Sequence, residues 1–145
     1  MTTYMATQNK TIIVDSSALV ALLKRDDADH EKAVVIMDGP VAQQQLRVIL
    51  PSEVLAETLN ILGKKLGNRA EVVAGWALLN RIDNSELLLT SSNPNLVRTA
   101  LELRATYTGN PSFIDCLVMS YAEEYQTNLV FGFDETFRKN GYRLP

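Results

Sequence analysis

The sequence predicts an α/β domain in which helices cover both faces of a mostly parallel central sheet, a three-layer α/β/α arrangement. Short apolar segments alternate with helical patterns along the chain, and no linker rich in Pro or Ser interrupts them. The first segment, residues 11–14, lacks polar alternation, which is typical of a strand buried on both faces. We therefore expect a single domain over residues 11–145, preceded by a polar, flexible leader over residues 1–10.

The expected elements follow in order. Strands are expected over residues 11–14, 47–50, 87–90 and 128–133, with a short edge strand within 141–145. Helices are expected over residues 18–24, 31–37, 53–66, 69–82, 94–107 and 113–125. Helix-stop residues at Gly39-Pro40 and Gly67-Asn68 set two of the ends, and Asn93-Pro94 forms a cap and first-turn pair for a third helix.

Composition limits the class of protein. The 145 residues are enough to bury a core, and 46% apolar and 21% charged residues are ordinary values for a soluble globular domain. No apolar run approaches the ~20 residues of a membrane span, and the N-terminal residues lack the apolar core of a signal peptide. A single cysteine permits no internal disulfide and fits a reducing compartment. We expect a cytoplasmic protein without membrane contact.

Charge and histidine content narrow the chemistry. A net charge of −3 argues against a high-affinity, non-specific nucleic-acid binder. It argues less against a nuclease, because acids that hold cations can themselves form the phosphate site. The single histidine, His30, excludes His-rich metal sites and argues against a His-based triad. Any hydrolytic chemistry would therefore fall to carboxylates.

Five acids occupy positions that a parallel sheet can bring to one edge. Asp15 follows the first strand directly and Asp134 follows the last. Glu53 and Glu57 lie one turn apart on one helix face, and Asp115 lies in the first turn of another helix. Because open α/β sheets place ligands at the carboxyl ends of their strands, we expect these acids to converge there.

Each acid also has a structural interpretation. Asp15 could cap the following helix, and Asp115 could complete a capping box with Ser112. The two glutamates could be solvated helix surface, and Asp134 could begin a turn. Together they are harder to explain structurally, because like charges ~4 Å apart repel by about 4 kcal/mol at an effective dielectric near 20. An edge carrying four carboxylates therefore needs a cation.

Four segments, in order, resemble the motifs of PIN-domain ribonucleases, in particular the VapC toxins of bacterial toxin–antitoxin pairs. The segments are Ile13–Leu22, Leu50–Glu57, Phe113–Leu117 and Phe133–Phe137. Each motif alone is weakly specific. The ordered set of four is more specific, and it covers nearly the whole chain.

The resemblance implies a PIN-like fold and an endoribonuclease that depends on Mg²⁺ or Mn²⁺. It assigns the metal, held directly or through water, to Asp15, Glu57, Asp115 and Asp134. It also implies an RNA substrate, an antitoxin that lies along an apolar groove, and a homodimer formed through helical faces. Mg²⁺ favours oxygen ligands and keeps several waters, so no side chain with a pKa near 7 is required.

Three further residues bear on this assignment. Ser17 matches a small hydroxyl position of the family and would orient a ligand or water, or else cap the helix. Glu53 competes with Glu57, and the motif position favours Glu57, leaving Glu53 in a supporting role. The family usually has Thr or Ser two residues before its fourth acid, where this chain has Gly132, so the match at Asp134 is the least complete.

Other classes fit less well. A haloacid-dehalogenase phosphatase needs D-x-D and an adhesion-type metal site needs D-x-S-x-S, but Ser17 and Leu19 occupy the deciding positions. A receiver domain would need paired acids near the first strand and a late lysine, and a flap-type nuclease would be longer. The remaining alternative is a PIN-like module that binds RNA or regulates without catalysis. His30, Cys116 and Trp76 are expected to be structural, Trp76 in the core or an interface.

Basic side chains are the candidates for phosphate contacts. They are Arg25, Lys64, Lys65, Arg69, Arg104, Arg138, Lys139 and Arg143.

Overall fold

The structure, a computed structural model, describes residues 10–107 and 109–145. Its centre is a four-stranded sheet with the order β3-β2-β1-β4, and all three strand pairings are parallel. The strands are β1 (Thr11–Val14), β2 (Arg47–Pro51), β3 (Leu88–Thr90) and β4 (Val130–Phe131). The predicted leader lies outside the described residues except for Lys10, so its flexibility stays a prediction.

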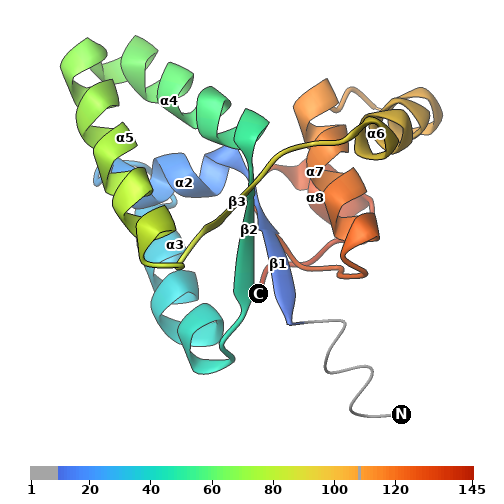
Figure 1. The fold of residues 1–145 in the computed structure, drawn as a ribbon, viewed down its shortest axis with the longest axis horizontal. Coiled ribbons are helices and arrows are strands. Elements are labelled where there is room, and N and C mark those ends of the chain that lie inside the picture. The colour runs from blue at the N-terminus through green and yellow to red at the C-terminus, as the bar shows by residue number, and fades with distance from the viewer. Residues whose placement is uncertain (1–9, 108) are drawn as a thin grey trace.

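Helices cover both sides of this sheet (Figure 1), which confirms the three-layer prediction. One side carries α2 (Ser16–Leu23), α3 (His30–Ile36), α4 (Ser52–Leu66) and α5 (Asn68–Asp83). The other side carries α6 (Pro94–Thr106), α7 (Phe113–Glu124) and α8 (Glu135–Lys139). No helix in the described part of the chain is both long enough and apolar enough to cross a membrane.

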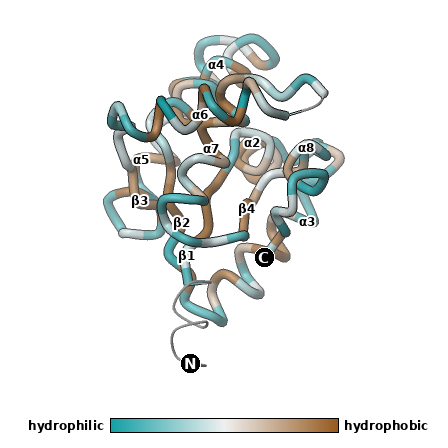
Figure 2. Tube along the Cα trace, turned by 90° about the vertical axis from the view of Figure 1, so that its right-hand side faces the viewer, coloured by the Kyte–Doolittle hydropathy of each residue, from teal (hydrophilic) through white to brown (hydrophobic). Residues whose placement is uncertain are grey.

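The core lies between the sheet and these helices. Figure 2 shows hydrophobic residues concentrated along the central strands. The whole of β1 is buried, as the unbroken apolar pattern predicts for a central parallel strand. Every residue from Cys116 to Ala122 of α7 is also buried. Both elements are therefore fixed in the core. They hold Asp15, which follows β1, and Asp115, which lies in the first turn of α7, in defined positions.

The second helix does not end at Gly39-Pro40 as predicted. It continues from α3 into a π-helical turn, η1 (Met37–Val41), with Pro40 inside it. Proline lacks an N–H and its ring collides with the preceding turn of an α-helix. A wider π turn accommodates that ring, so the chain remains helical past the proline.

The last strand is shorter than predicted, and the C-terminal strand is reduced to one bridge. Strand β4 covers two residues instead of the predicted segment 128–133. Its extension fails because the N–H of Phe133 donates to the hydroxyl of Ser17 (2.9 Å) and not to a neighbouring strand. Near the end of the chain, Leu129 and Arg143 form an isolated parallel bridge.

Candidate functional site

Asp15 lies at the carboxyl end of β1 and is the N-cap of α2. Its Oδ2 accepts hydrogen bonds from the backbone N–H of Ser17 (3.4 Å) and from the hydroxyl of Ser17 (3.1 Å). Its Oδ1 is buried and meets no hydrogen-bond donor among the described residues. Asp15 therefore caps α2 with one carboxylate oxygen, while its other oxygen is buried without a hydrogen-bond donor. A buried acceptor without a donor is energetically unfavourable.

Electrostatics link the predicted acids to one another. Burial raises the pKa of the Asp15 carboxyl to about 6, and the charges of Asp115 and Glu57 add to this effect against the N–H groups at the start of α2. Burial also raises the pKa of Asp115, and the charge of Asp134 adds to it. The structure thus brings the four acids near enough to interact, from β1, α4, α7 and the start of α8.

Glu57 is held next to Asp15 by a hydroxyl. The buried Ser16, which directly follows Asp15, donates from its Oγ to Glu57 Oε1. Helices α2 and α4 pack against each other. The bond from Ser16 to Glu57 therefore holds the Glu57 carboxylate close to Asp15. The Glu57 side chain is half-buried.

Glu53 and Glu57 both line a groove along α4. This α4 groove has a volume of about 520 Å³, and its other lining residues are Ala56, Asn60, Ile61, Lys64 and Ile114. Glu53 Oε1 accepts from the hydroxyls of Ser52 (3.2 Å) and Ser92 (3.0 Å). The glutamate that sequence reasoning placed second is therefore the one with more hydrogen bonds.

Asp115 belongs to the capping box that its structural interpretation predicted, and Asp134, which was expected to begin a turn, caps α8. Asp115 Oδ2 accepts from the N–H of Ser112 (2.9 Å) while the Asp115 N–H donates back to the Ser112 hydroxyl (3.0 Å). Asp134, which is exposed, accepts from the N–H of Thr136 (2.9 Å) at the start of α8. Each cap uses one carboxylate oxygen, so capping and ligand binding do not exclude each other.

Gly132 explains a departure from the expected fourth motif. A Cβ at this position would lie 2.8 Å from Asp15 Cβ and 3.0 Å from a ring carbon of Phe137. Beside it, the Ser17 hydroxyl bridges Asp15 Oδ2 and the N–H of Phe133. The first and fourth motifs therefore meet with no room for a side chain between them.

The acids interact through their charges but do not form a closed metal site. Within residues 10–107 and 109–145, no three His, Cys, Asp or Glu side chains are grouped closely enough to hold one ion between them. The donors are nevertheless all carboxylate oxygens, and Asp15 Oδ1 has no other described partner. These two features fit a hard divalent cation that keeps several of its waters.

Sequence reasoning missed the hydroxyls that hold the two glutamates, Ser16 and Ser92. Ser16 has a weak signal, its position beside Asp15. Ser92 has none, since it lies 39 residues from Glu53 in the chain.

The residues predicted to be structural divide into two groups. Cys116 is buried in α7 as predicted, and His30 Nδ1 lies 2.6 Å from the carbonyl oxygen of Ala21. Trp76 is 68% exposed on α5 and so does not belong to the core.

A parallel sheet with acids at the carboxyl ends of its strands defines an α/β domain of the class that binds ligands at that edge. A family profile described as "PIN domain" matches residues 12–141, so the chain belongs to the PIN-domain family.

Among solved structures, the chain is similar to VapC20 of Mycobacterium tuberculosis, described as a sarcin-ricin loop cleaving toxin. The TM-score is 0.76 at 23% sequence identity, covering 91% of this chain and 96% of that one. The similarity confirms the predicted fold. A comparison with curated protein sequences gave no significant match.

Proposed function

We propose that this PIN-domain protein is an endoribonuclease that depends on Mg²⁺ or Mn²⁺ and acts as the toxin of a VapBC-type toxin–antitoxin pair. The observation that carries the proposal is the buried Asp15 carboxylate. One of its oxygens lacks a described donor, and burial, with smaller effects from the charges of Asp115 and Glu57, raises its pKa. Family membership and the similarity to a toxin fold support the proposal.

Each residue has a distinct role in this proposal. Asp15, Glu57, Asp115 and Asp134 would hold the cation, directly or through water. When bound, such a cation activates water and offsets charge on the phosphate. Ser17 orients Asp15 by donating to its Oδ2, and Ser16 orients Glu57. The capping bonds of Asp115 and Asp134 fix those carboxylates in direction before any ligand arrives.

The partners follow from the same proposal. The substrate is RNA, the expected protein partner is an antitoxin, and the protein acts in the cytoplasm. The predicted homodimer would use an apolar helix face. On α5, four large side chains are 41–68% exposed, namely Val72, Val73, Trp76 and Leu79.

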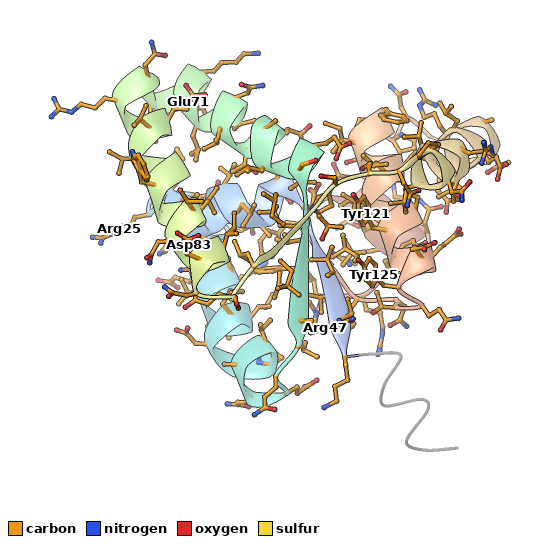
Figure 3. The ribbon with its side chains drawn as sticks, in the orientation of Figure 1. Arg25, Arg47, Glu71, Asp83, Tyr121 and Tyr125 are labelled. Carbon is orange, nitrogen blue, oxygen red and sulfur yellow. The ribbon has the colours of Figure 1, made fainter. Side chains whose placement is uncertain are left out.

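The test compares the wild-type chain with Asp115→Asn on a total-RNA pool. We expect cleavage with Mg²⁺ or Mn²⁺, no cleavage with EDTA, and loss of cleavage in the variant. Asp83→Asn is a matched control, because Asp83 is an exposed acid on α5, far from α7 (Figure 3). Cleavage that persists in EDTA and in Asp115→Asn would contradict the proposal. No cleavage together with no metal binding would favour the non-catalytic PIN-like module.

The α4 groove predicts which lysine contacts the RNA. Lys64 lines the groove and lies about 10 Å along the helix from Glu57. Its neighbour Lys65 points elsewhere on the helix and is not among the groove-lining residues. We expect Lys64→Ala to raise KM several-fold and to reduce the salt dependence of RNA binding by a slope of about 0.7. Lys65→Ala should change neither quantity, and equal effects of the two variants would exclude this path for the RNA.

A further inference from the structure

Glu53 accepts a hydrogen bond from a hydroxyl outside its own helix, in addition to the one from Ser52. Ser92 lies between β3 and α6, and its Oγ donates to Glu53 Oε1 (3.0 Å). The Ser92 Oγ is also 2.9 Å from the hydroxyl of Tyr121, a fully buried residue of α7. The Tyr121 hydroxyl in turn donates to the carbonyl oxygen of Thr90 at the end of β3 (3.3 Å). These contacts form a relay from α7 to α4.

The number of protons fixes the direction of the relay. A carboxylate only accepts hydrogen bonds, and each hydroxyl has one proton to donate. Because the Ser92 proton goes to Glu53, the Ser92 oxygen is the acceptor in its contact with Tyr121. The Tyr121 proton is therefore shared between Ser92 Oγ and the carbonyl of Thr90. Figure 3 shows Tyr121 on the side of α7 that faces the sheet.

The relay holds Glu53 in the same groove as Glu57. Both glutamates line the α4 groove together with Ile114, the residue before Asp115. Glu57 is held separately, by the hydroxyl of Ser16. Fixing a glutamate side chain costs rotamer entropy. For Glu53, the hydrogen bond from Ser92, which is itself held by Tyr121, offsets this cost.

We propose that Ser92 and Tyr121 are positioning residues that hold Glu53 beside Glu57, and that Glu53 thereby acts as a fifth carboxylate of the metal-binding edge. This inference rests on the proposed nuclease function. Glu53 then tunes the affinity for the cation, while the RNA contacts of the groove are unchanged. The relay acts only through the direction of the Glu53 carboxylate, because Tyr121 is buried and reaches neither RNA nor solvent.

The test removes the hydroxyl of Tyr121 and keeps its ring. With Tyr121→Phe, we expect the Mg²⁺ concentration for half-maximal cleavage to rise about fivefold, because one hydrogen bond is lost. The KM for RNA should change little. Ser92→Ala should have the same effect, and Ser92→Thr, which keeps a hydroxyl, should restore most of the wild-type value. Tyr125→Phe is the matched control, because it removes the same group one turn further on, at the C-cap of α7.

A double-mutant cycle separates positioning from general stability. Glu53→Gln should raise the Mg²⁺ requirement at least as much as Tyr121→Phe, and adding Tyr121→Phe to it should have no further effect. Additive effects, or a Tyr121→Phe variant that melts earlier but has the wild-type Mg²⁺ requirement, would overturn the inference alone. Absence of metal-dependent cleavage in the wild-type chain would overturn the inference together with the proposed function.

Discussion

Asp15→Asn is expected to abolish metal-dependent RNA cleavage and to make the metal-free protein more stable at pH 7. The side chain is 3% exposed, and burial together with neighbouring acids raises its pKa to about 6. At pH 7 the folded protein therefore holds a buried negative charge that its surroundings oppose. Asparagine removes that charge and keeps an oxygen to accept from Ser17.

The sign and size of this stability change follow from the pKa values of Asp15 in the folded and unfolded protein. The folded-state pKa of about 6 lies above the ordinary value of 3.8, so the unfolded chain releases this proton at lower pH. The contribution of Asp15 to stability is therefore fully present below about pH 4 and is lost as the pH rises through 6. The shift corresponds to about 3 kcal/mol. We expect Asp15→Asn to regain much of it at pH 7, roughly 5 °C or more in Tm.

The measurement is thermal unfolding in EDTA at pH 4 and pH 7. The stability difference between Asp15→Asn and wild type should be large at pH 7 and small at pH 4. Cleavage should fall at least about a hundredfold. Asp26→Asn is the control, because Asp26 is exposed and Lys24 lowers its pKa, so its removal should not stabilise the protein. A variant that is less stable than wild type at pH 7 would contradict this explanation.

Gly132→Ser is expected to destabilise the protein and to reduce cleavage, although serine matches the family pattern at this position. A Cβ there would lie 2.8 Å from Asp15 Cβ. Asp15 cannot retreat freely, since its N–H donates to the carbonyl of Phe131 (2.9 Å). Overpacking of this kind costs about 1–3 kcal/mol, and the displaced Asp15 would no longer face Glu57 and Asp115.

Gly39→Ala is the matched control for this glycine, because a Cβ at Gly39 would meet no atom within 4 Å. Urea unfolding and the RNA cleavage assay measure both effects. We expect a lower midpoint and at least about tenfold slower cleavage for Gly132→Ser, with neither change in Gly39→Ala. Wild-type stability and activity in Gly132→Ser would show that the first and fourth motifs tolerate a wider separation.

The parts of the site that depend on local pattern could be predicted from the sequence. The apolar run before Asp15 predicted a central parallel strand, and the strand ends placed Asp15 and Asp134 at one edge. The Ser112–Asp115 pair predicted a capping box that the structure contains. Each of these features depends on residues within a few positions of one strand end or helix start, where spacing determines geometry.

The contacts between distant segments could not be predicted in this way. Ser16 meets Glu57 across 41 residues, and Ser92 meets Glu53 across 39. Neither pairing has a local signal, because each depends on how α4 docks against the sheet edge. The choice between Glu53 and Glu57 rested on motif position alone for the same reason. Likewise, Pro40 stays within a helix because a π turn accommodates it, which spacing alone does not reveal.

The most direct test of the central claim is a calorimetric titration of Mn²⁺ into wild-type protein and Asp15→Asn at pH 7. If the carboxylate edge is a metal site, the wild-type chain binds Mn²⁺ and the variant loses that binding while remaining folded. Binding that is equal in the two proteins, or absent from both, would contradict the account.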